Sequence, residues 1–286
     1  LPASASHLSA LRGNRLLAAL PPAVLRELAP HLRQITLERG RVIFEPGDEV
    51  ETTHLPAGPA IISLVLVTRD GREVEAASIG REGAAGGIVS AGHKPAYARA
   101  VVQVAGPALA VATEVLESAK RRHPEISDLF SRYADSLLAQ VMQSVLCNAL
   151  HPVEQRACRW LLSTHDRAES NVIRLTQQAL AEMLGVQRTT VSGVAKALEH
   201  RGLIRQHHGH VEILDRDGLG EACCECYRAV EDHFAVLLPE CAEDVSLRRR
   251  RPPPRRAWAA GARGCPSGAR PGSSTSAQSR SAAPPG

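Results

Sequence analysis

Three polar side chains between residues 187 and 200 lie four positions apart: Arg188, Ser192 and Lys196. On a helix this spacing places them in one row, with Thr189 beside them. A guanidinium, hydroxyls and an ammonium that point the same way can donate hydrogen bonds to base edges and to phosphates. The positions that face the other way are apolar: Val191, Val194, Ala195 and Leu198. The pattern therefore predicts an amphipathic helix with one face suited to nucleic acid.

A second, shorter helix is predicted just before this one. Thr176 can cap it with its hydroxyl, and Leu180, Met183 and Leu184 follow at the spacing of one apolar helical face. Gly185 then interrupts the pattern, as a tight turn between two helices requires. Two helices joined by such a turn indicate a helix-turn-helix.

A β-hairpin is predicted after the second helix. Gly202 ends that helix, and apolar runs at residues 203–204 and 211–214 flank the sequence HHGH at 207–210. Two helices followed by a hairpin make a winged helix-turn-helix, whose second helix enters the DNA major groove. The alternative is an ordinary helical hairpin with a solvated polar face, and the predicted wing favours DNA binding.

The segment from Thr176 to Leu198 resembles the DNA-binding domain of the CRP/FNR family of bacterial transcription regulators. The similarity is carried by the pattern T-x-Q-x-x-A-x-x-x-G-x-x-R-x-T-V. It extends upstream through HPVEQR at residues 151–156, and more loosely over residues 15–240. The resemblance implies a homodimeric regulator of transcription that binds an inverted repeat in double-stranded DNA, with RNA polymerase as a further partner.

The resemblance also assigns DNA contacts. The candidate DNA-binding residues are Thr176, Gln177, Gln178, Arg188, Thr189, Thr190, Ser192 and Lys196. In the family's pattern the first arginine of the reading helix contacts guanine, and Arg188 holds that position. Thr176, Gln177 and Thr190 stand where phosphate contacts are expected. Gly193 replaces a second arginine of the cyclic-AMP branch, so the half-site is expected to differ from that branch's.

Residues 35–112 consist of short β-rich runs separated by turn signals. Asp70-Gly71 stands between the runs 61–67 and 73–79, which predicts a hairpin. Strands this closely spaced, with no helical pattern between them, indicate a small antiparallel barrel or roll. The CRP/FNR resemblance implies the same, a cyclic-nucleotide-binding-like β-roll. The predicted fold class is therefore α+β, with an N-terminal antiparallel β-roll, a long dimerisation helix and a C-terminal winged helix-turn-helix domain.

An effector site in the roll is a further implication of the resemblance. Its candidate residues are Gly80, Arg81, Glu82, Gly83 and Arg99. A phosphodiester needs a fixed guanidinium and N–H donors, and Arg99 falls where the family's phosphate arginine would be. Ala85 stands at the position of the family's ribose glutamate, so cyclic AMP is expected to bind weakly or not at all. The effector is either another small molecule or absent, and no cofactor is predicted.

A long amphipathic helix is predicted from Pro124 to about Ala149. Its length corresponds to roughly 37 Å. Apolar residues on adjacent rows imply two buried seams, one against the roll and one against a twin helix. The alternative is a helix that packs only within its own chain, and the family resemblance favours a homodimer. His151-Pro152 ends the helix and forms the hinge to the DNA-binding domain.

The chain has seven cysteines, of which Cys223, Cys224 and Cys226 are clustered. The cluster makes a metal or thiol-redox responsive regulator the alternative function. However, a single helix is predicted over residues 219–238, and adjacent thiolates on a helix point in different directions. Because no second C-x-x-C and no paired histidines complete a tetrahedral set, no metal ligand is predicted. No cysteine precedes Cys147, so the family's oxygen-sensing iron–sulfur branch is excluded.

The net charge of +4 comes from the C-terminus. Nine arginines and no acidic residue lie from Arg248 onward, so the preceding part carries −5. The DNA-binding prediction therefore rests on where the helix places its charges and not on the isoelectric point. From Arg248 the composition predicts a disordered basic tail. That tail is either a DNA-hugging arm or a frame-shifted or extended C-terminus.

An enzyme is not expected, because the sequence has no Walker loop, no G-x-S-x-G elbow and no paired metal motifs. No run approaches the length of a membrane span and no export signal is evident, so a cytoplasmic location without membrane contact is expected. Five segments are predicted. They are N-terminal helices at 1–32, the sensor roll at 33–120, the dimerisation helix at 121–150, the winged helix-turn-helix domain at 151–240 and the basic tail at 241–286.

Overall fold

A computed structural model describes residues 10–88, 94–168 and 170–241, and the elements in these ranges belong to one compact unit. The predicted basic tail lies outside the described residues except for Cys241, and so does the beginning of the predicted N-terminal segment. No prediction about the tail is tested by the structure.

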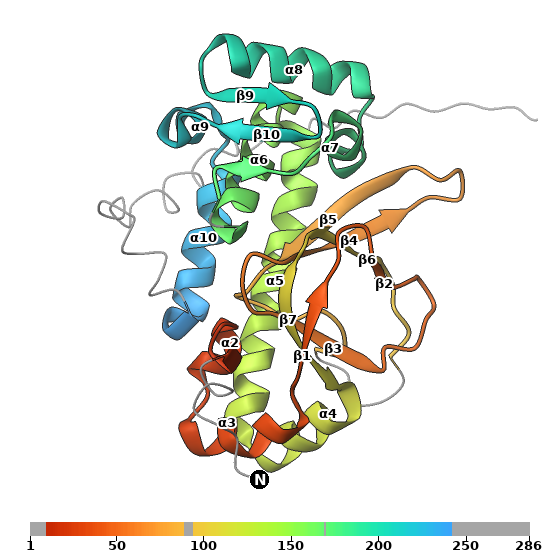
Figure 1. Ribbon diagram of the computed structural model, residues 1–286, viewed down its shortest axis with the longest axis vertical. Helices are drawn as coiled ribbons and strands as arrows, with labels where there is room; N and C mark the ends of the chain where they lie inside the picture. Colours follow the sequence, from red (N-terminus) through yellow and green to blue (C-terminus); the bar gives the residue numbers. More distant parts are fainter. Residues whose placement is uncertain (1–9, 89–93, 169, 242–286) are drawn as a thin grey trace, which may run out of the picture. The chain divides into compact units, whose positions relative to one another are not determined.

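Two short helices open the described chain (Figure 1). They are α2 (Arg15–Ala19) and α3 (Pro22–Leu28), followed by a 3-10 turn (Ala29–His31). Asn14 caps α2, because its Oδ1 accepts from Leu17 N at 3.2 Å. Its amide nitrogen also donates to the carbonyls of Pro56 and Gly83 at 2.9 and 2.8 Å. One buried side chain thus fixes the N-terminal helices to the sheet region.

Seven strands form the β-roll. They are β1 (Arg33–Leu37), β2 (Val42–Phe44), β3 (Thr52–Pro56), β4 (Ile61–Val67), β5 (Glu73–Ile79), β6 (Arg99–Val104) and β7 (Gly106–Ala112). They pair antiparallel in two sheets of order β1-β7-β3 and β2-β6-β4-β5. The hairpin predicted at Asp70-Gly71 joins β4 to β5 and is confirmed. Alternate residues of the inner faces, such as Ile62 and Val102, form the buried core of the roll.

Helix α4 (Thr113–Arg122) leads from the roll into the long helix α5 (Pro124–Leu150). Sequence periodicity predicted α5 with its end displaced by one residue, but it missed α4, which carries few apolar positions. Helix α4 spans the predicted domain boundary at residue 120. The first half of α5 buries Ile126, Phe130 and Tyr133 in a core shared with the N-terminal helices. This packing secures α5 along the roll.

The C-terminal part contains a compact helical and stranded domain. Its elements are α6 (Val153–Ala168), β8 (Val172–Ile173), α7 (Gln177–Leu184), α8 (Arg188–His200), β9 (Ile204–His207), β10 (His210–Ile213), α9 (Arg216–Ala222) and α10 (Cys226–Leu237). The strands form an antiparallel sheet of order β8-β10-β9. A separate apolar core, drawn from α6, α7, α8 and the sheet, holds this domain together.

The single closing helix predicted over residues 219–238 is wrong. The helix is interrupted at residues 223–225. Cys223 is extended there, with φ −81° and ψ 155°, and α10 begins at Cys226. The two helices have different neighbours, since α9 packs on α6 whereas α10 runs beside α5 (Figure 1). One straight helix could not pack on α6 and also run beside α5. Tertiary packing therefore overrides the local helical pattern.

Candidate DNA-binding interface

The turn between α7 and α8 has the chemistry that the sequence predicted. Thr176 caps α7, with its Oγ1 accepting from Ala179 N at 3.1 Å. Gly185 follows α7 in the left-handed region at φ +64°, which side chains with a Cβ rarely adopt. The turn therefore ends α7 and sets the direction in which α8 starts at Arg188.

Helix α8 turns its apolar side inward and its polar side outward. Val191, Ala195 and Leu198 are buried in the core of the domain. The candidate DNA contacts of this helix lie on the other side: Arg188, Thr189, Thr190 and Lys196 are exposed, and Ser192 is half-buried. Among the described residues, neither the Arg188 guanidinium nor the Lys196 ammonium forms an ion pair with a carboxylate. Both charges consequently face solvent.

Strands β9 and β10 form the predicted wing. They pair from Ile204 with Ile213 to His207 with His210, and the hairpin turns at His208-Gly209. The rings of His207 and His210 stack, with centroids 4.4 Å apart and an interplanar angle of 11°. The third strand, β8, was missed by sequence reasoning because it has only two residues and therefore no readable alternation.

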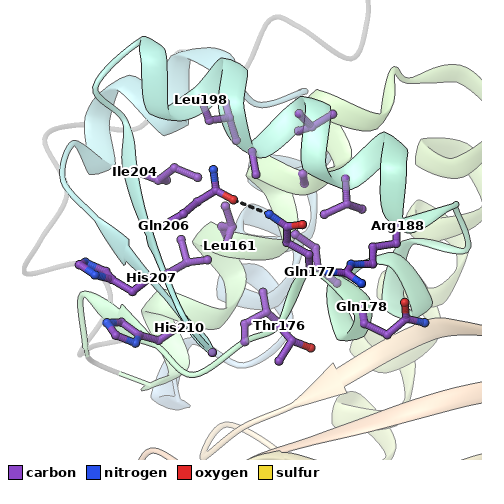
Figure 2. A pocket seen from close by; sticks show the side chains of 18 of the residues that line it. Leu161, Thr176, Gln177, Gln178, Arg188, Leu198, Ile204, Gln206, His207 and His210 are labelled. Carbon is purple, nitrogen blue, oxygen red and sulfur yellow. Dashed lines mark hydrogen bonds between the residues drawn. The ribbon is translucent and has the colours of Figure 1, made fainter.

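A chain of amide hydrogen bonds joins the three parts of this interface. Gln177 Nε2 donates to Gln206 Oε1 at 2.7 Å, which ties the start of α7 to the wing (Figure 2). Gln206 in turn donates to Glu199 on α8, through its backbone N at 2.8 Å and its Nε2 at 3.1 Å. Sequence reasoning assigned no role to Gln206 or Glu199, because their partners lie on other elements.

A pocket of about 550 Å³ opens between α7, α8 and the wing. Its inner wall is apolar and includes Leu161, Leu198 and Ile204, whereas Thr176 and Arg188 stand among the polar lining residues (Figure 2). Four of the predicted DNA contacts, Thr176, Gln177, Gln178 and Arg188, line this pocket. The other four, Thr189, Thr190, Ser192 and Lys196, lie on α8 outside the lining. Gln178, also in the lining, hydrogen-bonds Glu182 at 2.8 Å.

The candidate effector arginine is already balanced by two carboxylates. Arg99 Nε donates to Glu45 Oε2 at 2.8 Å, and Arg99 Nη1 donates to Glu73. The hydrogen bond that Arg99 donates to Glu45 and the nearby charges of both acids raise the pKa of Arg99 above its usual value. A phosphate ligand would have to compete with these partners for the guanidinium.

The other candidate effector residues hold the roll against neighbouring helices. The carbonyl of Arg81 accepts from Arg15 N at 2.7 Å. Gly83 lies so close to Tyr133 of α5 that a Cβ would overlap the phenol. Gly80 N donates to Glu82 Oε1 at 3.1 Å. These contacts give the Gly80 to Gly83 segment a structural role, and an effector role for it stays a prediction.

Two buried carboxylates connect the roll to α6. Arg167 Nε donates to Glu82 Oε1 at 2.7 Å, and Trp160 Nε1 donates to Glu75 Oε1 at 3.1 Å. Burial raises the pKa of Glu75. Burial alone would raise the pKa of Glu82 as well, but the Arg167 guanidinium beside it holds the pKa below its usual value. The roll and the DNA-binding domain are therefore joined by two polar contacts, one of which is an ion pair.

These features define a winged helix-turn-helix DNA-binding protein that carries a β-roll. Residues 155–222 match the Crp-like helix-turn-helix domain, a stretch that contains α7, α8 and the wing. No helix in residues 10–88, 94–168 and 170–241 is both long and apolar enough to cross a membrane.

Two curated relatives are similar to the chain in sequence, and one solved structure is similar to it in fold. The global nitrogen regulator of Nostoc sp. is 28% identical over 188 residues, which are 62% of this chain and 83% of the relative. The CRP-like cAMP-activated global transcriptional regulator of Mycobacterium tuberculosis is 25% identical over 210 residues, 69% of this chain and 91% of the relative. A CRP/FNR family transcriptional regulator from Thermus thermophilus shares the fold, with a TM-score of 0.56 at 20% identity over 66% of this chain and 97% of that one.

Residues 155–222 therefore form a Crp-like helix-turn-helix domain, and the chain is similar to transcription regulators of the CRP/FNR type. The predicted resemblance to the CRP/FNR family and the predicted fold class are confirmed. Its relatives are regulators of transcription rather than enzymes.

Proposed function

We propose that the protein is a homodimeric, sequence-specific DNA-binding regulator in which α8 reads the major groove. The observation that carries the proposal is the exposed row of Arg188, Ser192 and Lys196 on a helix whose other side is buried. A helix held in this way can present its N-terminal residues to base edges, while the wing and α7 lie beside the sugar-phosphate backbone of the DNA. The same domain in the relatives serves regulators of transcription.

Arg188 is the proposed base reader, because its fork can bond O6 and N7 of one guanine together. Ser192 and Lys196 stand one and two turns further along α8 and are free to contribute. Thr176, Gln177 and Thr190 are proposed to contact phosphates, and Gln178 and Thr189 lie beside them. Gln177 is held against the wing by Gln206, so it positions the backbone contact surface as well.

The second half of α5 supports a homodimer. Its exposed apolar side chains are Leu138 (57%), Met142 (64%), Val145 (65%), Leu146 (40%) and Leu150 (71%). Leu138 and Val145 are seven residues apart, with Met142 between them, which is the spacing of a seam between two helices. Water contact with so much apolar surface on one helix is unfavourable, and a twin α5 of a second copy would cover it.

Control by an effector bound to the roll is also part of the proposed function. The M. tuberculosis relative is a cAMP-activated regulator, and the roll is the proposed place for an effector in this chain. In this chain Ala85 replaces the ribose glutamate and is fully buried, so a small molecule other than cyclic AMP is the proposed effector. A cytoplasmic location and contact with RNA polymerase complete the proposed mode of action.

A binding selection from random double-stranded DNA tests the proposal. A dimer with two-fold symmetry should enrich an inverted repeat whose half-sites lie about 34 Å apart, one helical turn. Sedimentation of the free protein should give the mass of two chains. Enrichment of a single unpaired half-site, or no enrichment at all, would count against a dimeric reader.

A further inference from the structure

Four side chains with metal-binding chemistry meet outside the DNA-binding face. They are Cys147, His151, Cys224 and Cys226, and their ligand atoms all lie within 4.8 Å of one another. Cys147 lies in the last turn of α5 and His151 caps that helix. The other two come from the break between α9 and α10. Two segments that are far apart in sequence therefore build one cluster.

The spacing of the cluster suits one tetrahedral ion. Zinc binds sulfur at about 2.3 Å and imidazole nitrogen at about 2.0 Å, so two tetrahedral ligand atoms lie about 3.5 to 3.8 Å apart. Cys147 Sγ and Cys224 Sγ are separated by 3.6 Å, and Cys226 Sγ and His151 Nδ1 by 3.3 Å. A disulfide between the first pair would need its sulfurs at about 2.05 Å.

The surroundings support metal ligands in two ways. Cys147 and Cys226 are completely buried and Cys224 is 5% exposed, which keeps water away from an ion. His151 Nε2 lies 3.4 Å from Glu225 Oε1, the arrangement in which a carboxylate orients a ligating histidine. Gln143 Nε2 also donates to Cys226 Sγ at 3.1 Å, as donors to metal-bound thiolates do.

We propose that Cys147, His151, Cys224 and Cys226 bind one zinc-type divalent ion in a closed Cys3His site. Four protein ligands leave no open position, so the ion serves structure and not catalysis. A [4Fe–4S] cluster attaches each protein ligand to a different iron, and a [2Fe–2S] cluster divides four ligands between two irons. Either cluster spreads its ligands further apart than a single ion does. Three soft thiolates and an imidazole select zinc over magnesium or calcium.

The site lies where the long helix meets the DNA-binding domain. Cys147 lies in the last turn of α5, His151 immediately precedes the predicted hinge at Pro152, and Cys226 begins the helix that runs beside α5. An ion bound here would join the end of α5 to the α9–α10 break by bonds stronger than side-chain packing. It would therefore fix the direction in which the domain with α8 leaves the long helix.

The break between α9 and α10 explains why sequence reasoning predicted no metal ligand. On a continuous helix Cys224 and Cys226 would point about 200° apart. Because Cys223 is extended, both thiols can turn toward the end of α5. The two ligands that sequence reasoning did not connect with the cysteine cluster are Cys147 and His151, at the end of α5. They are four residues apart, a spacing that places both on one side of the helix end.

The adjacent cysteine provides a matched control. Cys223 is outside the four-residue set, and its Sγ donates to the carbonyl of Gln155 at 3.9 Å. The purified, reduced, full-length chain without a polyhistidine tag should retain about one zinc per chain, as closed zinc sites do. Cys223→Ser should retain the same amount, whereas Cys224→Ser should lose it. His151→Cys supplies a fourth thiolate and should restore what His151→Ala loses.

Two further measurements keep the test decisive if a ligand variant is insoluble. Cobalt added to the metal-free wild-type chain should give the intense visible spectrum and the thiolate charge-transfer band of tetrahedral Co²⁺. Glu225→Gln should weaken zinc affinity about tenfold, because only the orienting carboxylate changes. An octahedral cobalt spectrum, iron with cluster absorption, or equal zinc content in Cys223→Ser and Cys224→Ser would overturn the proposal. Zinc content is measured without DNA, so its failure leaves the proposed DNA binding untouched.

Discussion

Arg188 and Gln177 stand on the same surface, but their surroundings give them different duties. Arg188 is exposed and forms no ion pair among the described residues, so its guanidinium can turn to a base edge. Gln177 is half-buried and bonded to Gln206, so it holds the wing against the start of α7. The proposed base reading and the proposed positioning of the wing therefore belong to different side chains.

Replacing these two residues should separate specificity from affinity. Arg188→Ala should relax the preference at one base pair of each half-site, a loss of roughly 1 to 3 kcal/mol of discrimination. Gln177→Ala should weaken binding to all sequences alike. Binding selections on both variants and the wild type measure this difference. An unchanged motif for Arg188→Ala would mean that α8 does not read DNA as proposed.

His54 should make the protein lose stability in mild acid. It lies on β3, and burial lowers its pKa from 6.5 to about 4. Between pH 6.5 and pH 4, His54 is protonated in the unfolded chain but neutral in the folded chain. The free energy of unfolding therefore decreases as the pH falls from 6.5 toward 4. The full effect corresponds to about 3 kcal/mol.

The free energy of unfolding in urea, measured from pH 7.5 to 4 at one protein concentration, tests this. His54→Gln removes the titrating group, so the free energy of unfolding should depend less on pH in that range. His207→Gln, at a partly exposed ring of the wing, serves as the control and should keep the pH dependence. Equal slopes for the wild type and His54→Gln would contradict the prediction.

Local patterns were sufficient for elements that carry their own signals. The β4–β5 hairpin follows from Asp70-Gly71, α7 from its Thr176 cap, and α8 from one apolar face, because turn and helix chemistry depends on near neighbours. The separation of α9 from α10 depends on α6 and α5, which pack against different halves of that segment. Such contacts cannot be predicted from residues that are close in the sequence.

The candidate sites divide in the same way. The polar face of α8 could be predicted because its residues share one helix and one period. The cluster of Cys147 and His151 with Cys224 and Cys226 could not, since its halves meet only after α10 packs beside α5. The partners of Arg99 and Glu82 were hidden for the same reason, as each lies on a different element.

The exposed seam of α5 should decide whether two chains associate. Met142→Glu places a charge among Leu138, Val145 and Leu146, where a twin helix would have to bury it. Sedimentation velocity should show a monomer, and affinity for the inverted repeat should fall because two half-sites can no longer be bound together. Ser127→Glu adds the same charge at the exposed start of α5 and should leave the dimer intact. A dimer in both variants would place the interface elsewhere.

At the scale of the whole molecule, the roll and the DNA-binding domain are held together by a buried ion pair. Glu82 follows β5, Arg167 lies near the end of α6, and their side chains are 15% and 12% exposed. A paired charge of this kind contributes little by itself, because desolvation offsets most of the attraction. Removing one partner is costly, since the other charge stays buried alone.

A double-mutant cycle on this pair should show strong coupling. Glu82→Gln should lower the free energy of unfolding by about 3 to 5 kcal/mol, because Arg167 keeps its charge without its carboxylate. Combining it with Arg167→Met removes both charges and should recover much of that loss, giving a coupling energy well above the roughly 0.5 kcal/mol scatter of independent sites. Urea unfolding of the wild type, both single variants and the double variant supplies the cycle. Additive losses would mean that the pair does not tie the roll to α6, and that the hydrogen bond from Trp160 to Glu75 and the packing around it carry the connection.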